Sequence, residues 1–181
     1  DAIPTGLDTE SWTQATTPAM THYAADDSVA FGSEDAAGNQ LQYGNFYNGY
    51  AVQDSRGLCP SGWTVPTDAQ WMDLESYLGM DSIALTGTQY RPGVGHQISN
   101  SPSDTPPWSG NNLTGWSGTP GGARSGNYGY YFEESLVGYF WGRDDNWSGG
   151  ALPYRALGGG DAVYRLNRTP KAGFSVRCLK D

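Results

Sequence analysis

The C-terminal segment, residues 138–181, constrains the fold more than any other part of the chain. It begins with an aromatic cluster, Gly138–Trp141 (Gly-Tyr-Phe-Trp), and ends near Gly173–Cys178 (Gly-Phe-Ser-Val-Arg-Cys). Between these motifs, small, polar or turn-forming residues alternate with residues suited to a rigid framework. The framework candidates are Ala151, Arg155, Leu157, Val163, Arg165 and Lys171. This pattern is typical of a surface that displays side chains on loops, so it favours binding over catalysis.

The composition favours a loop-rich fold. A chain of 181 residues is long enough for one domain, residues 1–181, with a real core. It contains 26 Gly, seven Trp and twelve Tyr, with few long helical runs. Glycine and aromatic residues in this proportion predict an α+β or β fold whose core consists of a few large rings.

The charge argues against two classes of partner. A net charge of −9 disfavours binding to nucleic-acid phosphates and to anionic membrane surfaces, and otherwise serves solubility. No run of eighteen apolar residues is present, so no membrane span is expected. The N-terminus lacks a signal-peptide pattern, and one expectation is that a leader or another domain has been removed.

The clearest helix signal lies near residue 67. Thr67 and Gln70 have the spacing of a capping box, and Gly79 stands where a helix would stop. Apolar residues recur between them at helical spacing, which predicts a helix over 68–78. Residues 86–127 are rich in Gly, Ser, Asn, Thr and Pro, and predict ordered loops pinned by Trp108 and Trp116. Short strands are expected at 20–23, 139–141, 151–157, 162–165 and 173–178, and 46–52 is predicted as a strand or a buried turn.

Several motifs together resemble the Fibrobacter succinogenes major paralogous domain, a family common on bacterial surface proteins. The specific parts are Leu58-Cys59-Pro60-x-Gly62-Trp63 and the motif that ends in Cys178. The other matching stretches are Tyr43–Val52, Val65–Trp71, Gly138–Trp141, Tyr154–Leu157 and Val163–Arg165. The resemblance implies an α+β, C-type-lectin-like fold, related to formylglycine-generating enzymes, with short antiparallel strands and one or two helices. Trp63 and Trp141, in its motifs, are expected to be buried.

The two cysteines are open to two interpretations from their positions. Cys59 and Cys178 could form one long-range disulfide, which an extracellular setting would favour, or they could remain free thiols. The family resemblance implies that they pair.

The same resemblance suggests a source of sequence variation. Some family members are targets of diversity-generating retroelements, which rewrite adenines in a C-terminal variable region. Residues 142–172 contain no Glu, Gln or Met, one Lys and one Trp, and adenine randomisation of Asn codons cannot produce these five types. An ordinary Gly-rich surface loop would also account for this composition. After Trp141 this chain has Gly-Arg-Asp-Asp, where the family often has Ser-Ser-Thr-Glu.

The sequence offers no catalytic constellation, so no enzyme is predicted. His22 and His96 are isolated and are expected to be exposed, and no zinc-binding or nucleophile motif is found. Both cysteines lie in framework motifs, which disfavours the formylglycine-generating activity. Arg155, Arg165 and Arg177 are expected in structural ion pairs. No cofactor or metal is predicted; calcium is possible at an acidic group that lacks EF-hand spacing, Asp26, Asp27, Glu34, Asp35 and Asn39.

The sequence therefore predicts a non-enzymatic receptor or adhesin-type domain, with a variable ligand-binding region at 142–172. The expected partner is a protein or cell-surface ligand, and the expected location is extracellular, at the bacterial cell surface or on a phage virion. Glycan recognition is disfavoured because the Glu-Pro-Asn and Gln-Pro-Asp motifs of sugar lectins are missing. Two different functions stay open, a structural surface or adhesin-stalk domain and an enzyme of the formylglycine-generating type. The candidate ligand-binding residues are Arg143, Asp144, Asn146, Trp147, Leu152, Tyr154, Tyr164, Leu166, Asn167 and Arg168.

Overall fold

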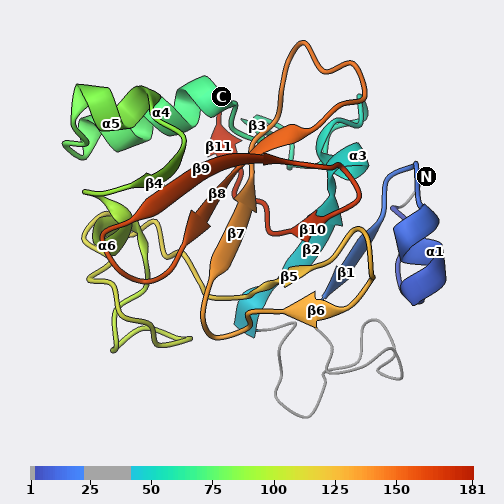
Figure 1. The fold of residues 1–181 in the computed structure, drawn as a ribbon, viewed down its shortest axis with the longest axis horizontal. Coiled ribbons are helices and arrows are strands. Elements are labelled where there is room, and N and C mark those ends of the chain that lie inside the picture. Colours follow the sequence, from blue (N-terminus) through green and yellow to red (C-terminus); the bar gives the residue numbers. More distant parts are fainter. Residues whose placement is uncertain (1–2, 23–41) are drawn as a thin grey trace.

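The computed structural model describes residues 3–22 and 42–181 (Figure 1). Its helices are α1 (Thr9–Gln14), α3 (Gly49–Val52), α4 (Asp68–Tyr77), α5 (Ser82–Thr86) and α6 (Gly95–Ile98). Its strands are β1 (Met20–His22), β2 (Asn45–Asn48), β3 (Trp63–Thr64), β4 (Gln89–Arg91), β5 (Ala123–Arg124), β6 (Tyr131–Phe132), β7 (Gly138–Trp141), β8 (Leu152–Leu157), β9 (Val163–Arg168), β10 (Gly173–Phe174) and β11 (Leu179–Lys180).

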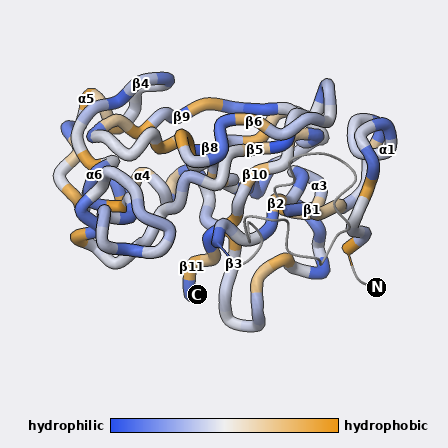
Figure 2. The backbone as a smooth tube through the Cα atoms, turned by 90° about the horizontal axis from the view of Figure 1, so that it is seen from below, coloured by the Kyte–Doolittle hydropathy of each residue, from blue (hydrophilic) through white to orange (hydrophobic). Residues whose placement is uncertain are grey.

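Antiparallel pairing joins the strands into three sheets. A five-stranded sheet has the order β1-β2-β10-β5-β6, and a four-stranded sheet has the order β4-β9-β8-β7. The third sheet pairs β11 with β3. Helices α4, α5 and α6 lie at one end of the molecule and α1 lies at the other, as Figures 1 and 2 both show. The predicted α+β class with short antiparallel strands is confirmed.

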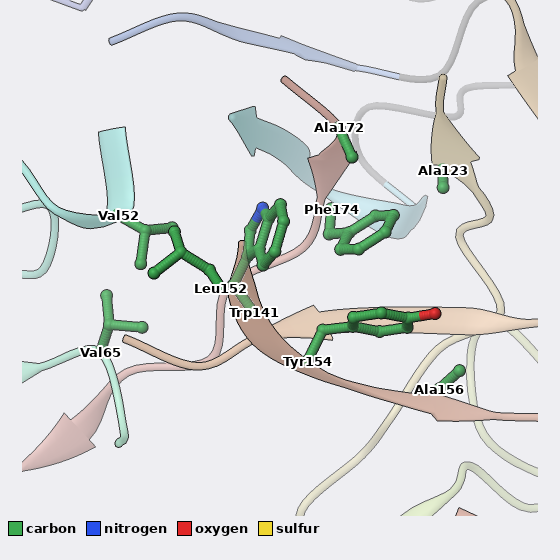
Figure 3. Packing of buried hydrophobic residues seen from close by; sticks show 9 residues of the cluster. All are labelled: Val52, Val65, Ala123, Trp141, Leu152, Tyr154, Ala156, Ala172 and Phe174. Atoms are coloured by element: carbon green, nitrogen blue, oxygen red, sulfur yellow. The ribbon is translucent and has the colours of Figure 1, made fainter. Parts of the chain in front are cut away.

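The main core lies between the two larger sheets and is built largely from rings. Trp141 and Tyr154 from the four-stranded sheet meet Phe174 from the five-stranded sheet, with the Trp141 and Phe174 ring centroids 4.5 Å apart (Figure 3). The indole Nε1 of Trp141 donates to the carbonyl oxygen of Tyr47 at 2.7 Å. This bond satisfies the polar edge of a ring that is otherwise fully buried.

A second core fills the space between the four-stranded sheet and the helices. Phe140 and Leu157 face this side, while the neighbouring residues of β7 and β8 face the main core, as the two-residue period of a strand requires. Trp71 of α4 packs against Trp116, which in turn lies edge-on to Phe140. Trp108 also packs here, so both predicted tryptophan anchors of the 86–127 loops are confirmed.

Helix α4 begins as the sequence predicted. The Thr67 side chain accepts from the backbone N–H of Gln70, and the Gln70 side chain accepts from the backbone N–H of Thr67. This reciprocal capping box satisfies two of the free N–H groups at the start of the helix. The helix ends at Tyr77, with Leu78 as its C-cap.

Buried ion pairs attach α4 to the four-stranded sheet. Glu75 accepts from both terminal nitrogens of Arg91 and from Nε of Arg155, and all three side chains have 1% or less of their surface exposed. Asp68, at the start of the same helix, pairs with Arg155 and Arg165. The predicted structural ion pairs of Arg155 and Arg165 are therefore confirmed.

The disulfide is formed. Cys59 and Cys178 are bonded, with their Cα atoms 5.9 Å apart. The bond lies beside the short β3–β11 sheet and ties the end of the chain to the segment that precedes α4. This confirms the pairing that the family resemblance implied.

Several expectations for single elements were wrong. The described residues contain five short helices, where one or two were predicted. The strand predicted over Gly173–Cys178 is limited to β10 (Gly173–Phe174). After it, the backbone N–H and carbonyl of Ser175 bond Tyr139 and Trp141 of β7, so the chain leaves the five-stranded sheet. His22 is buried, although it was expected to be exposed. Trp63 is 45% exposed, since it lies in the short outer β3 strand.

Candidate functional site

A polar cleft of about 500 Å³ lies where the β8–β9 hairpin meets the start of α4; we call it the hairpin cleft. One wall comes from the loop 142–151, a second from β8 and β9, and a third from the N-terminal turn of α4. The residues that line it are Thr67, Asp68, Ala69, Thr88, Arg143, Asp144, Asp145, Asn146, Ala151, Pro153, Arg165, Leu166 and Asn167.

The α4 wall is rigid because its side chains are already bonded. Asp68 accepts from Nη1 of Arg155 at 2.8 Å and from Nη2 of Arg165 at 2.5 Å. Burial alone would raise the pKa of Asp68, but the hydrogen bonds from Arg165 and Arg155 outweigh it and hold that pKa below its ordinary value. The carboxylate is therefore ionised and fixed at neutral pH.

The loop 142–151 is anchored through its main chain. The backbone N–H of Arg143 donates to the Pro66 carbonyl at 2.9 Å, and Gly142 donates to the Pro153 carbonyl at 2.8 Å. The side chain of Gln53 donates to the carbonyl oxygen of Asp144 at 2.8 Å. None of these bonds uses a side chain of residues 142–144, so the loop can keep its course when those side chains change.

A tryptophan closes the far end of this loop. Trp147 lies edge-on to Tyr50, with ring centroids 5.9 Å apart, and its Nε1 donates to the Gly150 carbonyl at 2.7 Å. Within the loop, Asp144 accepts from the backbone N–H of Asn146 at 2.9 Å. These contacts fix the part of the loop that follows the cleft residues 143–146, and Trp147 itself does not line the cleft.

The side chains that line the hairpin cleft include positive, negative and amide groups. Arg143 pairs with Asp145 at 2.8 Å, and both side chains are more than one-third exposed. An ion pair at this exposure contributes little to stability and is easily exchanged for a ligand. Asn146 and Asn167 are exposed and can both donate and accept hydrogen bonds. The cleft is therefore suited to a polar ligand that is recognised by several hydrogen bonds.

Five of the ten predicted ligand-binding residues line this cleft: Arg143, Asp144, Asn146, Leu166 and Asn167. Trp147 packs beside it. Tyr164 and Arg168 flank the cleft residues 165–167 on β9 and do not line the cleft; both are exposed, and the Tyr164 ring lies edge-on to Tyr90.

Leu152 and Tyr154 are corrections to the predicted set. Leu152 is 0% exposed and Tyr154 is 8% exposed, and both belong to the core between the sheets. On β8 the even-numbered residues point into that core, because successive side chains of a strand alternate between its two faces. These two residues hold the hairpin in place and offer no surface to a ligand.

Sequence reasoning missed the α4 wall of the cleft. Thr67 and Asp68 were interpreted only as a helix start, and Thr88 lay in a region predicted as loops. No spacing in the sequence connects them to residues 142–167, which lie far along the chain. Asp68, an acidic residue in the first turn of a capped helix, was the one available signal. Its pairing with Arg155 and Arg165 is known only from the fold.

Residues 3–22 and 42–181 contain no group of three or more His, Cys, Asp or Glu side chains placed to hold a metal ion. The acidic group Asp26–Asn39, proposed as a possible calcium site, lies outside the described residues. Of the helices in the described part of the chain, none combines the length and the apolar character needed to cross a membrane.

Two packed antiparallel sheets, a helix capped against them and a disulfide at the chain's end define an α+β domain with a cleft at its C-terminal hairpin. The chain belongs to the Fibrobacter succinogenes major domain family, whose sequence model matches residues 5–180. No curated protein and no solved structure matches the chain significantly.

Proposed function

We propose that this chain is a non-enzymatic ligand-binding domain with a C-type-lectin-like fold, which binds its partner through the hairpin cleft. The partner is a protein or another cell-surface molecule, and the domain acts outside the cell, on a bacterial surface or a phage virion. One observation carries the proposal: five predicted ligand-binding residues, from two segments of 142–167, line one cleft on a rigid frame.

The anchoring of the cleft loop supports diversification of its side chains. Main-chain bonds hold residues 142–144, while the framework residues Arg155 and Arg165 hold α4 against the sheet. Changes at Arg143, Asn146 or Asn167 would therefore alter the cleft surface and leave the core intact. This is the arrangement that a retroelement-diversified variable protein needs, because each variant must still fold.

A combined substitution tests the binding site. Arg143→Ala, Asn146→Ala and Asn167→Ala are introduced together, and the labelled domain is measured by flow cytometry on intact cells of a bacterial panel that the parent domain stains. We expect staining to be lost and the melting temperature to change by only a few degrees, since exposed substitutions usually alter stability by less than about 0.5 kcal/mol each.

Two exposed β9 residues that do not line the cleft provide the control. Tyr164→Ala with Arg168→Ala removes two large exposed side chains outside the cleft, so staining should persist. If the triple cleft variant stains cells as the parent does, the cleft is not the binding site and a structural stalk domain becomes the better interpretation. The diversification proposal has its own test, which is a search of the genome around the gene. A near-identical, adenine-marked copy of the segment that encodes 142–172, beside a reverse transcriptase gene, would support it.

A further inference from the structure

A second cleft, of about 450 Å³, also borders the start of α4; we call it the tryptophan cleft. Its apolar lining comes mainly from Pro66, Trp71, Leu74, Trp116 and Leu179. It shares no lining residue with the hairpin cleft, although both border residues 66–70. Its volume lies within the usual range for small-molecule sites.

Two indole rings form the inner part of this cleft. The centroids of Trp71 and Trp116 are 5.3 Å apart, with the rings inclined at 57°. Trp71 is 2% exposed, and its Nε1–H has no hydrogen-bond acceptor among the described residues. A buried indole N–H normally has a partner, so this unsatisfied donor marks the wall of the cleft as unusual.

Arg177 supplies the only charge in the lining of the tryptophan cleft, within the part of the chain that the structure describes. Its guanidinium carbon lies 5.2 Å from the ring centroid of Trp116, and its Nη2 donates to the carbonyl oxygens of Trp116 and Ser117. These contacts leave Nε and Nη1 without hydrogen bonds to residues 3–22 and 42–181, and no carboxylate there lies within ion-pair distance.

This arrangement differs from the ion pair expected for Arg177 from the sequence. The residue is exposed as a whole, yet partial desolvation lowers the pKa of its guanidinium. The guanidinium remains charged, because arginine does not lose its proton in proteins. Although the net charge of the chain is −9, the guanidinium at the rim of this aromatic cleft has no carboxylate partner among residues 3–22 and 42–181.

We propose that the tryptophan cleft binds a carboxylate that carries an aromatic ring. Nε and Nη1 of Arg177 lie on different edges of the guanidinium, and Nη2 is already bonded to main-chain carbonyls, so a carboxylate oxygen accepts one charge-assisted hydrogen bond from either free donor. The ring of the ligand packs against Trp71, Trp116 and Leu74, since aromatic pairs favour tilted or offset contact. This site is independent of the hairpin cleft, so either proposal can fail without the other.

The first probe is 3-phenylpropionate, added to the ¹⁵N-labelled domain and followed by NMR. We expect the indole N–H signals of Trp71 and Trp116 and the Nε–H signal of Arg177 to shift together in a saturable way. The amide 3-phenylpropionamide lacks the charge, and acetate lacks the ring, so each should bind about tenfold more weakly or worse. Absence of shifts at millimolar 3-phenylpropionate, or equal binding of the amide, would overturn the proposal.

Two variants locate the site. Arg177→Gln should weaken 3-phenylpropionate binding by about tenfold or more, whereas Arg56→Gln, an exposed arginine outside both clefts, should not. Leu179→Trp narrows the cleft but keeps Arg177, and it should also weaken binding, so the proposal stays testable if Arg177→Gln does not fold. Unchanged binding in Arg177→Gln or in Leu179→Trp would show that the probe binds elsewhere.

A peptide distinguishes the two sources of such a ligand. Gly-Gly-Phe with a free C-terminal carboxylate is compared with the same peptide amidated at its C-terminus. Tighter binding of the free-acid peptide than of 3-phenylpropionate would assign the site to polypeptide C-termini. Weaker binding would assign it to small aromatic acids, and both results would support recognition of a ring-bearing carboxylate.

Discussion

Arg155 and Glu75 meet at the centre of the fold although 80 residues separate them in the sequence. The Nε of Arg155 lies 2.6 Å from Oε1 of Glu75, and neither side chain is exposed to solvent. Because Glu75 also binds Arg91, one carboxylate on α4 holds two strands of the four-stranded sheet, β4 and β8. Asp68 supplies the second negative charge for Arg155.

Removal of the Glu75 charge should destabilise the domain strongly. In Glu75→Gln the shape is kept, but two buried guanidinium groups lose their common counter-ion, which typically costs about 3–5 kcal/mol. Urea unfolding monitored by tryptophan fluorescence measures the loss. The control is Asp54→Asn, which breaks the pair with the half-exposed Arg56 at the surface and should cost far less. A similar small loss in both variants would contradict the assigned role of Glu75.

The ion pairs of Asp68 predict a defined pH dependence. The pKa of Asp68 is lower in the folded than in the unfolded chain, so its contribution to stability is present above the unfolded pKa of about 4. That contribution is lost as the pH falls through the folded pKa. The difference in unfolding free energy between the parent and Asp68→Asn should therefore be largest near neutral pH and shrink below about pH 4. A difference that stays constant with pH would refute this.

Two tryptophans in family motifs should differ in their importance. Trp141→Ala empties a fully buried position and breaks the bond to the Tyr47 carbonyl, so a loss of about 3–5 kcal/mol is expected. Trp63→Ala affects a ring that is 45% exposed and should be much milder. Thermal melts of the two variants, recorded side by side, give the comparison. Equal melting temperatures would mean that the main core does not depend on Trp141.

Loss of the disulfide should destabilise the domain through its unfolded state. The bond joins residues separated by 119 positions, and a loop of this size corresponds to about 4–5 kcal/mol in chain-entropy terms. The Cys59→Ser, Cys178→Ser double variant should show this loss in urea unfolding. Alkylation of the unfolded, unreduced parent followed by intact-mass measurement checks the bond itself, since two alkylated thiols would show that it is absent.

Local signals in the sequence predicted local structure well. The capping residues Thr67 and Gln70 marked the start of α4, and the aromatic and apolar runs located β7, β8 and β9. Helix α1 was not predicted because it has only six residues. Asp8 caps it, and the burial of Trp12 holds it in place. Its stability comes from packing against distant residues, which no local pattern records.

The candidate site was predicted only in part, because the burial of some of its residues depends on packing against distant parts of the chain. Residues such as Asn146 and Asn167 were identified because they lie among framework residues. The two faces of β8 could not be assigned, however, because both are buried and β8 shows no alternation of polar and apolar residues. Tyr154 therefore looked as available as Tyr164. Arg155 was expected in an ion pair, but its partner Glu75 and the burial of Arg91 were not predicted, since a charged residue is expected at the surface.

The position of the disulfide has a mechanical consequence. When the chain is pulled from its two ends, force that enters at Asp181 reaches Cys178 after three residues and crosses directly to Cys59. Residues 60–177 then form a covalent loop outside the line of tension. Both clefts are lined entirely or almost entirely by this loop, so tension along the chain bypasses the residues that line them and is carried by the segment before Cys59.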